Sequence, residues 1–243
     1  MRALDNLVVV ITGASQGIGA AIARNFALHN ARVVVTGRNR ARLAENVAPY
    51  NIPRSRYLII AGDLTHPGTV KKIVSAAVKK FGRIDIFVNN AGVGIHKPVE
   101  ETTVAEYDTI MDTNLKAIFL SFRELIPLFR RQGGGQIINI SSGAARIGSP
   151  GLAVYAASKA AVNVLSESAA GEVRNQSIKI SVLSPASTDT KLMSQMSKQS
   201  RSPSKASLKL TVDEVAEAVI YLARQNSNAW TSMADIRPLL INR

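Results

Sequence analysis

The chain has 243 residues, 46% of them hydrophobic, which is sufficient to bury the core of one domain. It contains no cysteine, which excludes disulfides and thiolate chemistry, and no run near the roughly 18 apolar residues that cross a bilayer. Thirty Lys and Arg against 17 Asp and Glu give a net charge of +13, which favours acidic partners. Because the cations are scattered and not interleaved with aromatic residues, we expect solvated faces, no nucleic-acid or membrane partner, and a cytoplasmic protein.

Short apolar runs alternate with segments of helical periodicity along most of the chain. The expected strands are residues 7–12, 31–36, 56–61, 84–89, 136–141 and 179–183. The expected helices are residues 17–29, 41–48, 68–81, 104–131, 154–173 and 212–224. This alternation predicts a single α/β domain over residues 1–243, a doubly wound, Rossmann-like parallel sheet with helices on both faces.

Two segments interrupt this alternation. Pro127 lies late in the long helix expected over residues 104–131 and is expected to kink or end it. Residues 191–210 are rich in Ser, Lys and Met, and they predict a mobile, irregular insertion that acts as a lid over a substrate.

A glycine turn follows the first expected strand and opens the first expected helix. Its sequence is Thr12-Gly13-Ala14-Ser15-Gln16-Gly17-Ile18-Gly19. In such a turn, backbone N–H groups and the positive end of the helix can face a pyrophosphate. The same glycines alone would also suit a purely structural turn, so the wider context must decide between the two interpretations.

Further along the chain, a hydroxyl, a phenol and an ammonium suit carbonyl chemistry. Tyr155 and Lys159 are four residues apart in an expected helix, so their side chains share a face. Because a phenol with a pKa of about 10 exchanges protons poorly at neutral pH, we expect Lys159 and a nicotinamide cation to lower that pKa. Ser142 can hold a carbonyl oxygen by a hydrogen bond. Ser141 is the alternative, but adjacent strand residues point to opposite faces, so only one of the two should serve.

Together these motifs resemble the short-chain dehydrogenase/reductase family, and in particular its 3-oxoacyl-acyl-carrier-protein reductase-like members. The glycine spacing is that family's T-G-x-x-x-G-x-G, and Asn89-Asn90-Ala91-Gly92 matches its N-N-A-G segment. The resemblance covers about residues 4 to 192. It implies a hydride-transfer enzyme in which Tyr155 donates the proton, Ser142 stabilises the carbonyl oxygen, and Asn114 supports a water that links Lys159 to solvent.

The resemblance also implies the nucleotide-binding residues and the assembly. Asp63 matches the family's adenine-contacting Asp, and Lys159 is implied to hold the nicotinamide ribose. The implied cofactor-binding residues are Gly13, Ser15, Gln16, Gly17, Ile18, Gly19, Arg38, Asp63, Leu64, Asn90, Ala91, Gly92, Tyr155, Lys159, Pro185, Thr188 and Thr190. A homo-oligomer, either a tetramer or a dimer, is implied through the helices that begin near residues 104 and 154.

Two positions depart from the family pattern. Pro185-Ala186 replaces the usual Pro-Gly and adds a methyl group to the loop that holds the nicotinamide amide. The segment Ala234-Asp235-Ile236-Arg237-Pro238-Leu239 replaces the common glycine-rich ending.

The end of the second expected strand indicates which nucleotide binds. An acidic residue there would accept hydrogen bonds from the ribose 2′-OH and repel a 2′-phosphate. This chain has Gly37 and then Arg38, whose guanidinium can pair with such a phosphate, so we expect NADPH rather than NADH. The alternative is that Arg38 is one more surface cation.

The expected pocket walls, residues 94–96, 143–145, 185–186 and 191–210, are small and apolar and suit a carbonyl on an aliphatic or acyl arm. The three histidines match no metal spacing, although His96 can reach the substrate. Cations that suit a phosphopantetheine arm or an acidic carrier protein are Lys191, Lys198, Arg201, Lys205 and Lys209.

We therefore expect an NADPH-dependent oxidoreductase that acts on a ketone or secondary alcohol, with a 3-oxoacyl thioester as the favoured substrate. Other ketones, sugars, steroids and quinones stay open. The alternative from a different class is an NADP-binding sensor or scaffold, or a basic protein associated with nucleic acid, without turnover.

Overall fold

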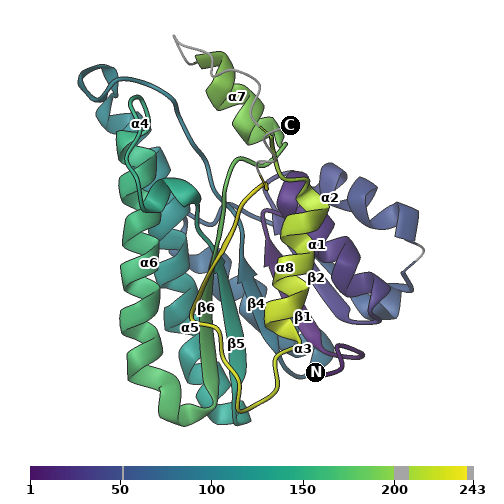
Figure 1. The fold of residues 1–243 in the computed structure, drawn as a ribbon. Coiled ribbons are helices and arrows are strands. Elements are labelled where there is room, and N and C mark those ends of the chain that lie inside the picture. Colours follow the sequence, from purple (N-terminus) through teal and green to yellow (C-terminus); the bar gives the residue numbers. More distant parts are fainter. Residues whose placement is uncertain (51, 200–207, 240–243) are drawn as a thin grey trace.

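Seven parallel strands form one sheet at the centre of the computed structural model, which describes residues 1–50, 52–199 and 208–239 (Figure 1). The strands are β1 (Val8–Thr12), β2 (Arg32–Gly37), β3 (Tyr57–Ala61), β4 (Ile86–Asn89), β5 (Gly135–Ile140), β6 (Ile178–Pro185) and β7 (Met233–Ile236). Their order in the sheet is β3-β2-β1-β4-β5-β6-β7. Every residue of β1 is buried, because both faces of the central strands are covered.

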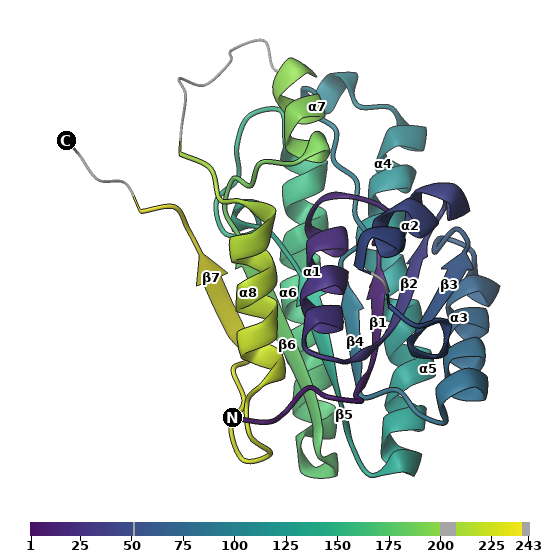
Figure 2. The ribbon, with the colours of Figure 1, turned by 90° about the vertical axis from the view of Figure 1, so that its right-hand side faces the viewer.

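Helices cover the two faces as two separate layers (Figures 1 and 2). The first layer contains α1 (Gly17–Leu28), α2 (Arg40–Val47) and α8 (Val212–Ala223), which share one hydrophobic cluster with the sheet. The second contains α3 (Pro67–Phe81), α5 (Ala117–Gln132) and α6 (Ala153–Val173), which share another. The predicted doubly wound parallel sheet is thus confirmed. Within the described ranges, no helix is both long enough and apolar enough to cross a bilayer.

The order of the strands reverses between β1 and β4. The chain moves outward from β1 to β3 and then returns to place β4 on the other side of β1. The loops that leave two such strands diverge, so a crevice forms at their carboxyl ends. Residues 13–19 and 90–92 follow these two strands, and the topology alone places both segments at the crevice.

The helix predicted over residues 104–131 is interrupted at a different place. The π-helical segment Asp112–Lys116 separates α4 (Val104–Met111) from α5, and α5 continues past Pro127 to Gln132. Because proline has no N–H group, the carbonyl group one turn earlier in the helix lacks its hydrogen-bond donor. Pro127 lies on the exposed side of α5, so water can hydrate that carbonyl group. Pro127 therefore does not end the helix.

Two further elements differ from the predicted ones. Residues 191–199 form α7 (Lys191–Gln199), in which Leu192 and Met196 are four residues apart and share a face, so the prediction of irregular chain is wrong there. Residues 200–207 lie outside the described residues, and the predicted motion of the segment 191–210 stays a prediction. The sequence does not predict β7, since its four residues are only partly buried and form no apolar run.

Candidate active site

A cleft of about 1090 Å³ opens at the carboxyl ends of the strands, at the end of the molecule where α4 and α7 lie (Figure 1). It is lined by the turns after β1 and β4, the segments after β5 and β6, and one side of α7. The predicted site residues that line it are Gly13, Ser15, Gln16, Gly17, Ile18, Arg38, Asp63, Leu64, Asn90, Ala91, Gly92, Ser142, Tyr155, Lys159, Pro185, Thr188 and Thr190. Of the predicted site residues, Gly19 and Asn114 are absent from the described lining of the cleft.

Two glycines allow the turn after β1 to pack closely against the loop after β4. Gly13 has a φ of +65°, and a Cβ atom there would lie 2.8 Å from Cα of Ala91. A Cβ atom at Gly19 would collide with the carbonyl oxygen of Gly13 and with the side-chain nitrogen of Asn90. Gly19 therefore serves the packing behind the cleft, and its predicted contact with a cofactor stays a prediction.

Thr12 and Asn90 fasten these two loops together. The Thr12 hydroxyl oxygen accepts hydrogen bonds from the backbone N–H groups of Asn90 (2.9 Å) and Ala91 (3.0 Å). The Asn90 side-chain amide donates to the carbonyl oxygen of Thr12 (2.9 Å). The sequence motif contains Thr12, but only the structure shows that its side chain holds the cleft in shape.

The start of α1 fits an anionic group. Gln16 occupies the N-cap and makes no side-chain capping hydrogen bond to the described helix, whose first turn holds no acidic residue. Gly17, at the first position of α1, lines the cleft. Backbone N–H groups and the positive end of the helix dipole therefore face this part of the cleft, as binding of a pyrophosphate requires.

The end of β2 places a cation beside the cleft. Gly37 is buried, and Arg38 follows it as an exposed side chain on the cleft surface. After β3, Asp63 accepts hydrogen bonds from the backbone N–H (3.0 Å) and the hydroxyl (2.9 Å) of Thr65. The backbone bond is the main cause that lowers the pKa of Asp63, and the nearby charge of Arg38 lowers it further.

The Ser142 side chain lies beside the Tyr155 phenol and lowers its pKa slightly. The Ser142 hydroxyl oxygen also accepts a hydrogen bond from the backbone N–H of Ala144 (3.2 Å). Ser141 has a different partner, because its buried hydroxyl donates to the backbone carbonyl oxygen of Lys159 (3.3 Å). Of the two serines, Ser142 is thus the one that contacts the phenol.

Burial sets the pKa of Tyr155 in the protein without a nucleotide. The residue is only 9% exposed, and this burial raises the pKa of the phenol, with a smaller opposing effect of the Ser142 side chain. Burial dominates because the phenolate loses its hydration. The expected lowering of this pKa by Lys159 and a nicotinamide cation together stays a prediction.

Lys159 is a buried ammonium. It is 4% exposed, and its Nζ donates a hydrogen bond to the carbonyl oxygen of Ile140 (2.9 Å) at the end of β5. Burial lowers the pKa of Lys159 from 10.5 to about 8. No carboxylate of the described chain forms an ion pair with Lys159. The positive charge of its ammonium group in the wall of the cleft is therefore not neutralised.

Asn114 lies in the π-helical segment and holds the wall beside Lys159. It is fully buried, and its side chain accepts from the backbone N–H of Val93 (2.8 Å) and donates to the carbonyl oxygen of Val93 (2.9 Å) and the hydroxyl of Ser158 (3.0 Å). A Cβ atom at Gly92 would lie 3.3 Å from Asn114 Oδ1 and 3.5 Å from Lys159 Nζ, so the two side chains approach each other there. π-Helical turns of this kind are frequent at functional sites.

Ala186, which replaces the usual glycine after β6, is accommodated without strain. Its backbone N–H donates to the carbonyl oxygen of Ile236 (2.9 Å) in β7. Among the described residues other than glycine, a positive φ occurs only at Asn6, Asn30 and Ser177. Because Ala186 needs no left-handed backbone, its extra methyl group does not disturb the loop that carries Thr188 and Thr190.

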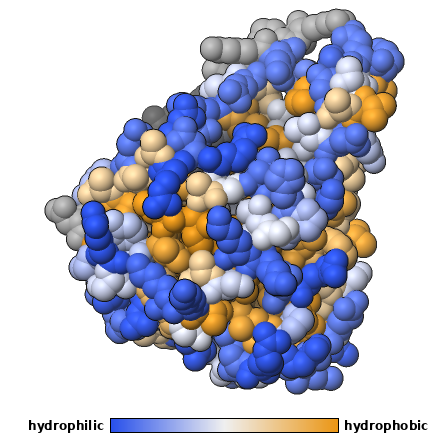
Figure 3. All heavy atoms as spheres, turned by 180° about the vertical axis from the view of Figure 1, so that it is seen from behind, coloured by the Kyte–Doolittle hydropathy of each residue, from blue (hydrophilic) through white to orange (hydrophobic). Residues whose placement is uncertain are grey.

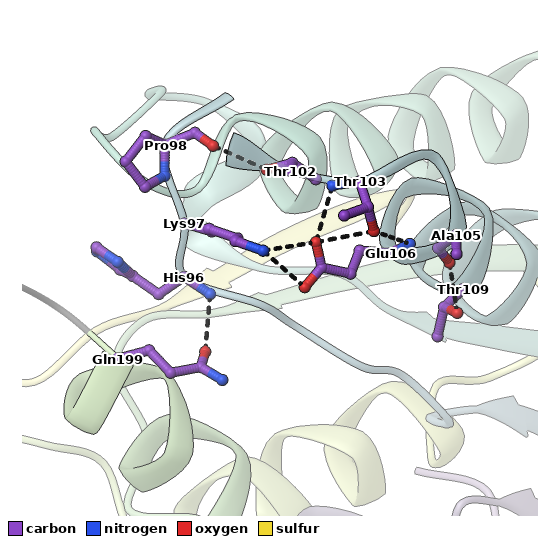
Figure 4. Close-up of polar contacts among 9 residues, drawn as sticks. All are labelled: His96, Lys97, Pro98, Thr102, Thr103, Ala105, Glu106, Thr109 and Gln199. Carbon is purple, nitrogen blue, oxygen red and sulfur yellow. Dashed lines mark hydrogen bonds and ion pairs between the residues drawn. The ribbon is translucent and has the colours of Figure 1, made fainter. Parts of the chain in front are cut away.

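One side of the cleft is closed by α7 together with the segment that follows β4. Figure 4 shows the backbone N–H of His96 donating to the side chain of Gln199 (3.0 Å) and Lys97 paired with Glu106 of α4 (3.0 Å). A Cβ atom at Gly94 would lie 2.6 Å from the sulfur of Met196 and 3.3 Å from the ring of Tyr155. The buried Met196 therefore packs α7 directly above the Tyr155 side chain.

The structure separates the cations predicted at the entrance and adds lining residues that the sequence does not predict. Lys191 lines the cleft, whereas Lys209 pairs with Asp189 (3.7 Å). Arg201 and Lys205 lie outside the described residues, as does the side chain of Lys198. The additional lining residues include Asp108, Asp112, Ile147, Leu152 and Arg237, whereas Met193 and Met196 belong to the expected wall 191–210. Helical periodicity marks apolar faces, so it could not have indicated the polar residues among them.

Comparisons with known proteins agree with this geometry. The model of the short chain dehydrogenase family matches residues 7–201. An uncharacterized oxidoreductase of Staphylococcus epidermidis is 31% identical over 239 residues, which cover 98% of this chain and 100% of the relative. The chain therefore belongs to the short-chain dehydrogenase/reductase family and is an oxidoreductase of that family.

Two solved structures share the whole fold. A metagenomic short-chain oxidoreductase in complex with NADP is 33% identical, with a TM-score of 0.84 and coverage of 98% of this chain and 100% of the other. A 3-ketoacyl-(acyl-carrier-protein) reductase from Brucella melitensis complexed with NADH is 33% identical, with a TM-score of 0.85 and coverage of 96% and 98%. The similar proteins thus bind nicotinamide nucleotides of both kinds.

The buried charge of Lys159 leads to a prediction about stability. A pKa lowered from 10.5 to about 8 corresponds to about 3 kcal/mol of destabilisation of the folded state below pH 8. Between about pH 8 and 10.5 the folded protein binds fewer protons than the unfolded chain, so stability rises with pH there. Lys159→Met should therefore increase the free energy of unfolding at pH 7 by about 1–3 kcal/mol, and this gain should fade as the pH approaches 10.

Denaturant unfolding at several pH values measures this difference. Lys71→Met, which replaces an exposed lysine of α3, is the matched control and should change stability little and without this pH dependence. A Lys159→Met protein that is less stable than the wild type at every pH would contradict the prediction.

Proposed function

We propose that the protein catalyses NADPH-dependent reduction of a ketone, or the reverse oxidation of a secondary alcohol. The observation that carries this proposal is that Ser142, Tyr155 and the buried Lys159 line the same cleft as the glycine turn, with Lys159 one turn after Tyr155 in α6. When bound, the nucleotide supplies or accepts the hydride. In this proposal, residues 1–243 form one dinucleotide-binding and catalytic domain, and residues 191–210 act as the lid of its cleft. The protein works in the cytoplasm.

The side chains of the cleft handle the proton. In the reductive direction, Ser142 donates a hydrogen bond to the carbonyl oxygen, and Tyr155 gives the same oxygen its proton as hydride reaches carbon. The product is the alcohol, and Tyr155 is left as a phenolate that Lys159 and the nicotinamide charge stabilise. Lys159 also holds the nicotinamide ribose, and Asn114 acts as a positioning residue, because it holds Val93 and Ser158 beside the ammonium.

A sensor or nucleic-acid-associated function without turnover is not favoured. The family is one of oxidoreductases, and Ser142, Tyr155 and Lys159 are all present in the cleft. Among substrates, we favour a 3-oxoacyl thioester, since Ile147, Leu152, Met193 and Met196 give the cleft an apolar side that suits an acyl arm. An NADPH-consumption screen over ketones, sugars and acetoacetyl thioesters tests this choice.

Removing the proton donor should abolish turnover and spare nucleotide binding. We expect Tyr155→Phe to lower kcat by about 100- to 10,000-fold, and Ser142→Ala by about 100- to 1,000-fold. The absorbance of NADPH at the maximum of the reduced ring follows turnover, and fluorescence titration follows binding. Ser141→Ala is the matched control and should retain most of the activity. Turnover of Tyr155→Phe within a few-fold of the wild type would remove the mechanism.

Arg38 should select the phosphorylated nucleotide. Arg38 lies on the cleft surface directly after β2, and β2 itself ends in Gly37 and not in an acidic residue that would repel a 2′-phosphate. We expect Arg38→Asp to lower the ratio of kcat/KM for NADPH to that for NADH by about 100-fold, through a lost ion pair and a new repulsion. Arg40→Asp makes the same change of charge on α2 outside the cleft and should leave the ratio almost unchanged. An unchanged ratio in Arg38→Asp would show that another residue selects the nucleotide.

The outer face of α5 and α6 should bind a second copy of the chain. A groove there is lined by Met111, Leu115, Phe119, Val164 and Leu165, and Phe119 and Val164 are 46% and 65% exposed. Figure 3 shows hydrophobic side chains along its right-hand edge, where this face lies. In light scattering we expect a wild-type dimer or tetramer and a Val164→Asp monomer, whereas Leu28→Asp on α1 should keep the assembly. A monomeric wild type would contradict the proposal.

A further inference from the structure

Arg237 follows β7, the strand that stands in place of a glycine-rich ending, and its side chain lines the cleft. In Figure 2, β7 forms the free edge of the sheet beside β6 and α8. The register pairs Ser184 with Asp235 and Pro185 with Ile236. The end of β7 thus lies next to the segment after β6 that borders the reacting groups.

The two faces of β7 have different neighbours. Ala234 and Ile236 pack against the hydrophobic cluster of α1 and α8, so Asp235 lies on the opposite face. Asp235 there pairs with Arg146 (2.9 Å), which ends the short helix that begins after Ser142. Arg237 directly follows this strand and lines the same cleft as Ser142 and Tyr155.

The charges on this side of the cleft do not balance. Arg146 and Asp235 neutralise each other, and Arg237 is exposed without an ion-pair partner among the described residues. The acidic residues that line the cleft, Asp63, Asp108 and Asp112, come from the loop after β3 and from the region of α4. The cleft therefore has a net positive wall at β7.

Lys191, the other cation on this side, lies nearer to the nucleotide. It follows Thr190, whose side chain would be 3.7 Å from a Cβ atom at Gly17 in the glycine turn. Arg237 instead follows the edge strand β7, next to the segment after β6. Of the two cations, Arg237 is therefore the one placed for the substrate.

We propose that Arg237 determines substrate specificity by binding an anionic group, a carboxylate or a phosphate, on the part of the substrate remote from its carbonyl. A guanidinium offers two parallel N–H donors that match either group. The inference rests on the proposed carbonyl reduction and specifies the substrate class of the same site.

The test uses pairs of substrates that share a reacting carbonyl and differ in charge. Acetoacetyl-coenzyme A carries phosphates, together with a pantoyl group and an adenosine, that acetoacetyl-N-acetylcysteamine lacks, and acetoacetate and methyl acetoacetate differ in the charge of the carboxyl group. For each pair, kcat and KM are measured with NADPH for the wild type, Arg237→Gln and Arg237→Lys. Arg174→Gln removes an exposed arginine outside the cleft and is the control for the overall field of the protein.

We expect the wild type to prefer the anionic member of one pair, which identifies a phosphate or a carboxylate as the ligand. Arg237→Gln should lower kcat/KM for that member about tenfold, mainly through KM, and leave the neutral member unchanged. Arg237→Lys should retain most of the preference, and Arg174→Gln all of it.

Two results would overturn the inference while the proposed function stands: reduction of neutral members with no preference for the anionic ones, or an equal loss in Arg237→Gln and Arg174→Gln. Failure of the wild type to reduce any member with either nucleotide would count against the proposed function itself, and with it the inference.

Discussion

The site depends on one constraint, a buried ammonium group with which no carboxylate of residues 1–50, 52–199 and 208–239 forms an ion pair. Lys159 has the carbonyl oxygen of Ile140 as a hydrogen-bond partner, and its pKa is lowered to about 8 by burial. A carboxylate beside it would stabilise the fold but would also neutralise the charge that a phenolate needs. The protein thus keeps a destabilising cation in its core, which is a common compromise between stability and activity.

The rest of the architecture keeps that cation in place and dry. Asn114 can reach both Val93 and Ser158 because the π-helical segment lies between α4 and α5. Thr12 ties the glycine turn to the loop after β4, so the two halves of the cleft form one rigid floor at the reversal of strand order. Met196 of α7 covers the phenol from the other side. Burial of Tyr155, which raises its pKa, follows from the same close packing.

Fixed spacings and apolar runs made the sheet and most of the lining residues predictable. Apart from β7, the strands are largely apolar runs, and the carboxyl ends of parallel strands necessarily meet at one edge, which brought Gly13 and Ser142 to one cleft. The π-helical turn at Asn114 was not predictable, since an extra residue in a helix leaves its apolar pattern nearly unchanged. Nor was the direction of the Tyr155 pKa, which depends on depth of burial, or the packing role of Gly19, which depends on a contact distant in sequence.

The central claim is that burial alone makes the phenol less acidic and that the nucleotide's positive charge, added to Lys159, reverses this. The most direct measurement is an absorbance titration of the Tyr155 phenolate, taken as wild type minus Tyr155→Phe, with and without NADP⁺. We predict a pKa above the ordinary 10.0 without nucleotide and a pKa below that value with saturating NADP⁺. A pKa that does not change when NADP⁺ binds, or one already below 10.0 without it, would contradict the claim.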